Sequence, residues 1–592
     1  MPGPPGSPGP GPTVNWLLRL DRTSRLVLLS VLLGIVGALG ARLFEWMIEW
    51  VSHYLIAGLA HNPLLGTTQA AALAGPPPQH YLNWLIPVST TLGGLIVGVL
   101  VYTLAPESEG HGTDAAVKAY HRLDGFVRAR VPVIKTIASA ITIGSGGAAG
   151  REGPTAQIAA GFGSVAGTLL RLPAEERRYL VLVGMAAGLS AVFKSPLGTA
   201  IFAVEILYRE MAFEGGALVF TLIGAATAYA VIGSFTGWTP LFALPAPLDF
   251  TGVRELGWFA ILGVVAGLVA TLIPWVFYRL RDWFRALPVP NHVKPAIGGL
   301  LMGLLAMALP QLLGGGYGFM QLAIDGRLAL WLMVLLAFGK IVAMSFTISS
   351  GGSGGVFGPT LFVGSMLGGA LAAFLHYLTP SGPSPEALAV VGMAAIFAGA
   401  ARVPLATLIM VAEMTGGYRL IVPTMLAVAL SYVIQDTLTR RAKYPTLYEW
   451  QVAHPGDSPV HQQEYYQAVL KLLRQRVVTL DPTILDREFV DRLSRGEPVP
   501  MVGRHEFVYM TEVPPDCPVA SKQLRELSLP SNVLIAGVMH NERASIPDGN
   551  TVLEEGDRLT VVATQEAMES FKMMLSGRRR EESGERVAAG SD

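Results

Sequence analysis

The first 450 residues of this chain consist largely of long apolar segments with few or no charges. Gly215 to Leu248 and Trp84 to Pro106 contain no charged residue at all. A helix needs about 20 mostly apolar residues to cross a bilayer. A series of such segments predicts an all-α, polytopic membrane protein. Its surroundings are then a lipid bilayer.

Several of the apolar segments are too short to cross a membrane upright. Pro196 to Leu207 and Pro404 to Ala412 are examples, and each begins with a proline. Irregular backbone at membrane depth must be buried in protein or must line a cavity. Paired short segments interrupted by Gly and Pro are typical of transporter folds, whose helices break around a central site. We therefore expect broken or tilted helices.

An internal repeat supports this interpretation. Three motifs recur in the same order: GMAA at 184–187 and 392–395, Pro-Leu-x-Thr with a later glutamate at 196–205 and 404–413, and SGG followed by GPT from Ser145 and from Ser353. Aligning Ser145 with Ser353 leaves three residues fewer before the second GPT. The pattern predicts two inverted repeats, at about 84–235 and 295–440.

The composition agrees with a membrane protein and excludes other classes. Only 15% of the 592 residues are charged, against roughly a quarter in ordinary globular chains. The 43 Lys and Arg balance 43 Asp and Glu, which suggests no nucleic-acid partner. A single cysteine, Cys517, excludes an intrachain disulfide framework.

The stretch from Gly144 to Pro154, GSGGAAGREGP, has the features of an anion site. Its glycines let backbone N–H groups approach a bound ion closely. Pro154 marks the start of a helix, where free N–H groups and the helix dipole attract anions. Glu152 is itself an anion at that position. It could fill an anion site and leave it when protonated or displaced.

The composition changes after Trp450, which divides the chain into domains. We expect a disordered Pro/Gly-rich segment at 1–13, a membrane domain at 14–452, a linker with an amphipathic helix (Gln462 to Val478) at 453–505, and a charged disordered tail at 578–592. Residues 506–577 predict a small cytosolic α+β domain. Its expected strands are Phe507–Val513, Asn532–Val538 and Arg558–Ala563, with turns at 548–550 and 555–557.

These motifs resemble the CLC chloride channel and transporter family. GREGP at 150–154 is similar to the family's gating-glutamate motif, and GGVFGP at 354–359 to its second anion motif; Lys135 and Lys340, each before a Gly-rich turn, fit as well. The resemblance implies Glu152 as gate. It implies anion binding by the following residues: His111, Gly112, Gly150, Arg151, Gly153, Val356, Phe357 and Tyr448.

The resemblance also implies an assembly and a location. It implies a homodimer with one pore per subunit, bound chloride ions and no other cofactor. It implies a multi-pass protein of a bacterial inner membrane with both termini cytosolic. The C-terminal segment IPDGNTVLEEGDRLTVV looks like an RCK-C (TrkA-C) regulatory domain, which would bind an unknown small ligand.

Two positions depart from the family pattern. The stretch Gly110-His111-Gly112 replaces the usual GSGIP, so an imidazole stands where a serine hydroxyl is expected. An imidazole near its ordinary pKa of about 6.5 would gain charge on acidification and strengthen anion binding. Ile206 stands where the family's exchangers carry a proton-transfer glutamate. The neighbouring Glu205 is a possible relay, although Glu205 and its repeat partner Glu413 fit a structural role better.

The function expected from these residues is chloride transport through a pore gated by Glu152 and regulated by the C-terminal domain. Passive conduction is preferred because Ile206 cannot titrate, and proton-coupled exchange is the alternative. Selectivity for fluoride or another anion stays open.

Two rival classes are considered. An intramembrane enzyme would need a nucleophile, metal ligands or a second carboxylate, and no HExxH motif occurs, so we expect no enzyme. A potassium system would need a carbonyl filter, for which Gly315-Gly316-Tyr317-Gly318 is a poor substitute.

Overall fold

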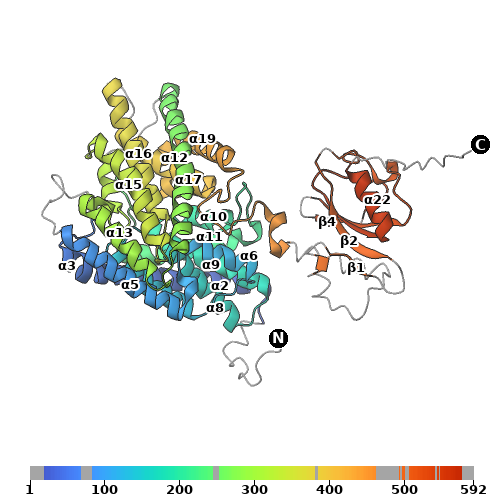
Figure 1. Cartoon of the computed structure of the whole chain (residues 1–592), viewed down its shortest axis with the longest axis horizontal. Coiled ribbons are helices and arrows are strands. Elements are labelled where there is room, and N and C mark those ends of the chain that lie inside the picture. The colour runs from blue at the N-terminus through green and yellow to red at the C-terminus, as the bar shows by residue number, and fades with distance from the viewer. Residues whose placement is uncertain are drawn as a thin grey trace, which may run out of the picture. The chain divides into compact units, whose positions relative to one another are not determined.

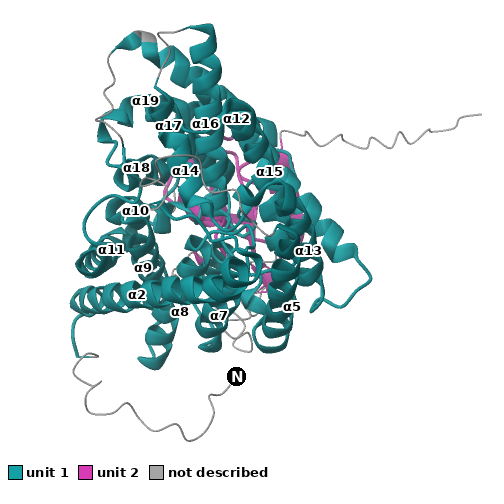
Figure 2. Ribbon diagram, turned by 90° about the vertical axis from the view of Figure 1, so that its left-hand side faces the viewer, with its two compact units in different colours: residues 1–454 teal, residues 455–592 magenta. Residues whose placement is uncertain are grey.

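The computed structural model describes residues 19–67, 83–244, 252–379, 384–461, 492–493, 497–500, 506–515, 517–540, 543–545 and 547–576. The chain forms two compact units, Met1–His454 and Pro455–Asp592 (Figure 2). The segments expected to be disordered, 1–13 and 578–592, and the amphipathic helix expected at 462–478 lie outside the described residues.

Unit 1 is a bundle of helices (Figure 1). Seven described spans are long and apolar enough to cross a membrane. The helices in those spans are α2 (Arg22–Ser52), α5 (Ile86–Leu104), α11 (Gly215–Thr236), α12 (Val253–Ala286), α15 (Leu330–Ser349), α16 (Phe357–Leu378) and α19 (Ile421–Thr439). The remaining main helices are α6 (Thr113–Arg122), α7 (Arg130–Gly144), α8 (Glu152–Leu169), α9 (Ala174–Phe193), α10 (Pro196–Glu205), α13 (Lys294–Ala308), α14 (Tyr317–Ile324), α17 (Pro385–Ala401) and α18 (Pro404–Thr415). The predicted polytopic helical fold is confirmed.

The GMAA motifs lie on the two most buried helices, α9 and α17. Every residue of α9 from Leu180 onward and of α17 from Ala387 onward is buried, as expected for apolar helix segments surrounded by protein. A Cβ on Gly184 would lie 2.1 Å from the carbonyl oxygen of Ala159 on α8. A Cβ on Gly392 would lie 2.4 Å from the carbonyl oxygen of Gly364 on α16. In each repeat, therefore, a glycine allows two helix backbones to touch.

The backbone of the glycine-rich loops corrects the sequence alignment of the repeats. Gly146 and Gly351 both have a left-handed φ, 103° and 100°. Ser145 and Ser350 each donate from Oγ to the carbonyl three residues earlier, at 3.1 Å. Ser145 therefore corresponds to Ser350. Its alignment with Ser353, with three residues missing, is wrong.

The corrected alignment runs on without a gap into the following helices. α8 begins at Glu152 and α16 begins at Phe357, at the same offset as the two serines. The position of Glu152 in the first repeat is thus held by an aromatic residue, Phe357, in the second. The loops before α6 and α14 match as well, because Gly112 and Gly316 share a left-handed φ of 88° and 82°.

Each of the two repeated glutamates caps the N-terminus of a helix in the other repeat. Glu205, at the end of α10, accepts hydrogen bonds from the N–H groups of Leu405 (3.1 Å) and Ala406 (2.7 Å) at the start of α18. Glu413, on α18, accepts from Gly198 N–H at 2.9 Å and from Ser195 Oγ at 2.5 Å, at the start of α10. A carboxylate at a helix N-terminus satisfies free N–H groups and the dipole. Both glutamates thus hold the repeats together.

Unit 2 contains a five-stranded antiparallel sheet in the order β1-β2-β5-β3-β4. Its elements are β1 (Val499–Pro500), β2 (Phe507–Glu512), β3 (Val533–His540), β4 (Arg543–Ser545), β5 (Arg558–Ala563) and the helix α22 (Gln565–Leu575). Ile535 and Val538 of β3 and all of β5 from Leu559 onward are buried, and α22 packs Phe571 into this core. The three predicted strands and the small α+β fold are confirmed.

One ion-paired histidine stands at the end of β3. His540 Nδ1 lies 2.7 Å from Asp557 Oδ1, and Nε2 lies 3.3 Å from Glu554 Oε2. The hydrogen bond to Asp557 raises the pKa of His540. The two carboxylates therefore favour the charged imidazole in this domain.

Candidate functional site

The site is centred on Glu152, the first residue of α8. Glu152 has no exposed surface, and its Oε2 accepts a hydrogen bond from the N–H of Gly358 at 3.2 Å. Its Oε1 is buried and has no hydrogen-bond partner among the described residues. A buried carboxylate oxygen without a partner costs free energy. One oxygen of this carboxylate is therefore buried at a cost in free energy.

Glycines surround the carboxylate because backbone fills the space where side chains would be. Gly150 and Gly355 exchange N–H···O hydrogen bonds of 2.8 and 2.7 Å, which join the loop before α8 to the loop before α16. A Cβ on Gly150 would lie 2.2 Å from Oε2 of Glu152. A Cβ on Gly153 would lie 2.0 Å from the carbonyl oxygen of His111. Only glycine permits this packing.

His111 and Tyr448 form a second wall of the site. Their rings meet edge to face with centroids 5.3 Å apart. Both residues are buried, and neither His111 Nδ1 nor the Tyr448 hydroxyl has a hydrogen-bond partner in the part of the chain that is described. His111 Nε2 lies 4.0 Å from Asp114 Oδ2, and Asp114 accepts from Trp450 N–H at 2.9 Å. Two unpaired polar groups are thus available to a bound anion.

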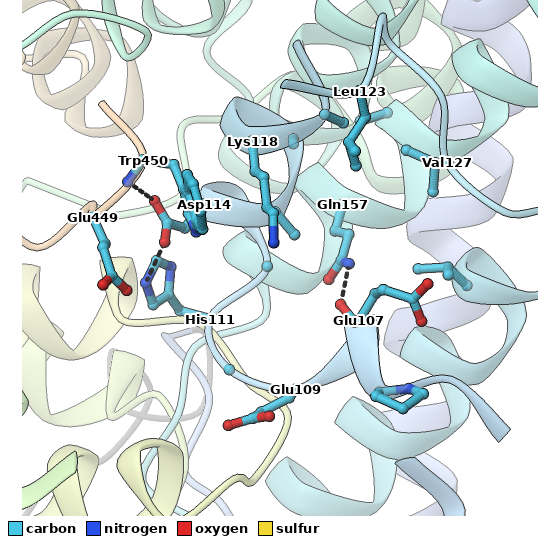
Figure 3. Close-up of a pocket in the computed structure, with 18 of the residues that line it drawn as sticks. Glu107, Glu109, His111, Asp114, Lys118, Leu123, Val127, Gln157, Glu449 and Trp450 are labelled. Carbon is cyan, nitrogen blue, oxygen red and sulfur yellow. Dashed lines mark hydrogen bonds and ion pairs between the residues drawn. The ribbon is translucent and has the colours of Figure 1, made fainter. Parts of the chain in front are cut away.

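A cavity of about 460 Å³ reaches this wall (Figure 3). Gly110, His111, Gly112 and Asp114 are among its lining residues. Charged side chains of both signs line the rest: Glu107, Glu109, Lys118, Arg128, Arg281, Arg285 and Glu449. The cavity therefore brings charged groups from several elements close to His111. The Glu152 side chain is not part of the cavity wall.

Lys135 and Lys340, which have no exposed surface, hold the loops. Lys135 donates to the carbonyls of Ser108 (3.0 Å) and Gly110 (2.7 Å). Lys340 donates in the same way to Leu312 (2.8 Å) and Gly314 (2.7 Å). Each ammonium group thus ties the glycine loop before α6 or α14 to the membrane unit.

The remaining predicted residues point elsewhere with their side chains. Arg151 forms an ion pair with Glu45 on α2. Val356 is buried, and Phe357 packs against Phe193 (centroids 4.5 Å apart) and Phe397 (3.8 Å). Any role of these residues at an anion site would have to be carried by their backbone.

The sequence analysis did not identify Tyr317, the first residue of α14. Its ring lies under the Arg151 guanidinium, with Cζ 5.2 Å from the ring centroid, and its hydroxyl is buried. The sequence analysis could have identified Tyr317 if the two repeats had been aligned correctly. Tyr317 follows Gly316 as Thr113 follows Gly112 in the first repeat.

Comparison with protein-family models shows which family the chain belongs to. The family model described as voltage-gated chloride channel matches residues 93–436, more than half of the chain. The chain belongs to the CLC family. A TrkA-C domain model matches residues 508–576 of the same chain. Both resemblances seen in the sequence are confirmed, and this CLC protein is an integral, multi-pass membrane protein.

Two curated CLC relatives are similar over most of their length. One is the putative chloride channel protein ClcB-like of Ralstonia nicotianae, 32% identical over 417 residues, which cover 69% of this chain and 93% of the relative. Another is the H(+)/Cl(-) exchange transporter ClcA of Citrobacter koseri, 29% identical over 449 residues, which cover 74% of this chain and 91% of the relative. Both names describe transport proteins rather than enzymes.

Solved structures share the CLC fold. A slow cyanobacterial Cl-/H+ antiporter superposes with a TM-score of 0.61 at 24% identity and covers 71% of this chain and 96% of its own. A CLC-type fluoride/proton antiporter superposes with a TM-score of 0.58 at 20% identity, over 73% of this chain and 97% of its own. At these identities the likeness establishes the fold alone.

Proposed function

We propose that this CLC protein moves chloride across a membrane along a pathway gated by the Glu152 carboxylate. The observation that carries the proposal is the buried Glu152, with one unpaired oxygen, at the N-terminus of α8 and against the N–H of Gly358. N–H groups at helix N-termini replace the hydration of an anion without a full positive charge, so the ion can leave again. The relatives' names support chloride as the anion.

The proposal includes a setting for the protein. We place it in a bacterial inner membrane as a homodimer with both termini in the cytosol. Trp450 lines the cavity shortly before the chain leaves unit 1, so the cavity belongs to the cytosolic side. Chloride would enter there, pass Gly112, His111 and Tyr448, and meet the backbone of Gly150, Arg151, Gly153, Val356 and Phe357 beside the gate.

Ion efflux from proteoliposomes tests the substrate. Vesicles are loaded with chloride, fluoride or potassium salts, and each efflux is measured after dilution. Chloride efflux that requires the protein supports the proposal. Potassium efflux without chloride efflux, or fluoride efflux alone, would contradict it.

His111 is expected to bind chloride as a neutral N–H donor. Burial and the nearby cationic Lys135 and Arg281 oppose a second proton on the ring, and Asp114 at 4.0 Å is the facing group that favours one. We therefore propose that His111 stays neutral, instead of gaining charge near pH ~6.5. We predict that His111→Ala weakens chloride binding about tenfold, the effect of losing one hydrogen bond to an ion.

Calorimetric chloride titration at about pH 5.5 and 7.5 checks this prediction. A Glu152→Ala background removes competition from the gate. We expect the same loss at both pH values. A loss confined to the lower pH would show that a charged imidazole binds the ion.

Proton coupling is the second candidate function. The name of the ClcA relatives favours exchange. The residues of this chain favour uncoupled transport, since Ile206 cannot titrate and Glu205 is engaged by two N–H groups of α18. We predict chloride flux without proton movement in vesicles held at zero voltage by potassium and valinomycin. Uphill proton movement that disappears in Glu152→Gln would instead establish exchange.

The TrkA-C-like domain is proposed to regulate transport by binding a small ligand. Unit 2 has its own sheet and core, so removing it need not disturb unit 1. We predict that deleting residues 463–592 leaves chloride efflux intact and changes its regulation, measured as the response to a cytosolic extract. Correctly inserted protein without efflux would argue against a purely regulatory domain.

A further inference from the structure

Tyr317 places an unpaired hydroxyl beside the gate. Tyr317 Oη lies 2.9 Å from the position that a Cβ on Gly358 would occupy, and the two carboxylate oxygens of Glu152 lie 3.2 and 3.3 Å from the same position. The hydroxyl oxygen and Glu152 Oε1 are both buried without a hydrogen-bond partner among the described residues. An O–H donor and a carboxylate acceptor, both unsatisfied, therefore face one small space.

The surroundings of Tyr317 fix its ring in this place. A Cβ on Gly315 would lie 2.4 Å from the ring, so glycine at 315 makes room for it. The Arg151 guanidinium covers the ring and is itself held by Glu45. Lys340 anchors the loop through the carbonyl of Gly314 at 2.7 Å. These contacts fix the ring and the loop that carries it.

We infer that Tyr317 is a latch for the gate: its hydroxyl, unpaired in this structure, turns toward the Glu152 carboxylate, donates a hydrogen bond to it and so holds it in the closed position. The inference rests on the proposed gating function of Glu152. Packing alone does not account for the residue, because phenylalanine would fill the same space without a buried polar oxygen. The Glu152 carboxylate then accepts two hydrogen bonds, one from Gly358 N–H at the start of α16 and one from Tyr317 O–H at the start of α14.

The latch has a definite chemical effect. A hydrogen bond from a neutral hydroxyl stabilises the ionised carboxylate more than the protonated one. The latch therefore keeps Glu152 seated at neutral pH, and acid releases it. It also gives Glu152 an advantage over chloride in the competition for the site. Tyr317 acts through Glu152, so it is a positioning residue.

The test is Tyr317→Phe, which removes only the oxygen and leaves the ring under Arg151. We expect the pH of half-maximal chloride efflux to move up by about one unit, the effect of one hydrogen bond to a charged group. Apparent chloride binding by calorimetry at neutral pH should tighten about tenfold, because chloride displaces the released gate more easily. Tyr418→Phe, at a tyrosine that is 56% exposed, is the matched control and should behave as wild type.

Two results would overturn the latch. An unchanged pH midpoint in Tyr317→Phe shows that the hydroxyl does not hold the gate. Weaker chloride binding shows that it contacts the ion instead. In Glu152→Ala, adding Tyr317→Phe should leave efflux unchanged, since the partner is gone. If Glu152→Ala alone keeps its pH dependence, the gating proposal itself fails; if only Tyr317→Phe is silent, gating stands and the latch fails.

Discussion

Glu152→Ala is expected to abolish the pH dependence of chloride efflux. In the wild-type protein, efflux should rise at least about tenfold between pH 7.5 and 4.5, because each pH unit changes the protonated fraction of a carboxylate by up to tenfold. Protonation weakens the hold of Gly358 N–H on the side chain and lets chloride take its place. Without the carboxylate no group competes for the site, so the ratio of the two effluxes should fall to about one.

Proteoliposome efflux at the two pH values measures this change. Glu152→Gln tests the same idea with a side chain of equal size that cannot ionise. Glu386→Gln is the matched control, because Glu386 also lies in the first turn of a buried helix, α17, outside the site. The gate assignment fails if Glu152→Ala retains the wild-type ratio, or if the control loses it.

Gly153→Ala should weaken chloride binding at least about tenfold. The added methyl group would lie 2.0 Å from the carbonyl oxygen of His111 and 3.0 Å from Cα of Gly355. Neither backbone atom can rotate away, so the start of α8 must move from the two loops it touches. Overpacking of this kind costs about 1–3 kcal/mol. Here the cost separates the groups that would surround the anion.

Chloride titration calorimetry on purified protein checks this prediction. Gly257→Ala on α12 is the matched control, because nothing lies within 4 Å of a Cβ at that position. Elution as folded protein in gel filtration separates a lost site from a lost fold. Wild-type chloride affinity in Gly153→Ala would mean that the contact between Gly153 and His111 does not shape the site.

The sequence was sufficient for the main features of the chain. Charge-free segments such as Gly215 to Leu248 predict membrane helices because lipid excludes charges and unpaired backbone groups. Glu152 stands out because a carboxylate among glycines is rare in an apolar chain. The strands of unit 2 follow from local alternation of polar and apolar residues. Each of these predictions depends only on the residues of one continuous segment.

The tertiary structure decided which segments meet, and this altered several interpretations. It showed that Ser145 corresponds to Ser350 in the repeat, because matching left-handed glycines identify the turns where short motifs are ambiguous. It showed that the Glu205 carboxylate caps the N-terminus of α18, a helix that begins about 200 residues further along the chain. It brought Tyr317 and Glu152 to the same glycine, Gly358.

Local sequence cannot show such contacts, because propensity and periodicity record a residue's own helix or strand, not its neighbours across the fold. The residue types around Glu152 were therefore determined by the sequence. Which of these residues contact one another, and which keep a polar group unpaired, was determined only by the tertiary structure. There the loop before α8 in one repeat packs against the loop before α16 in the other.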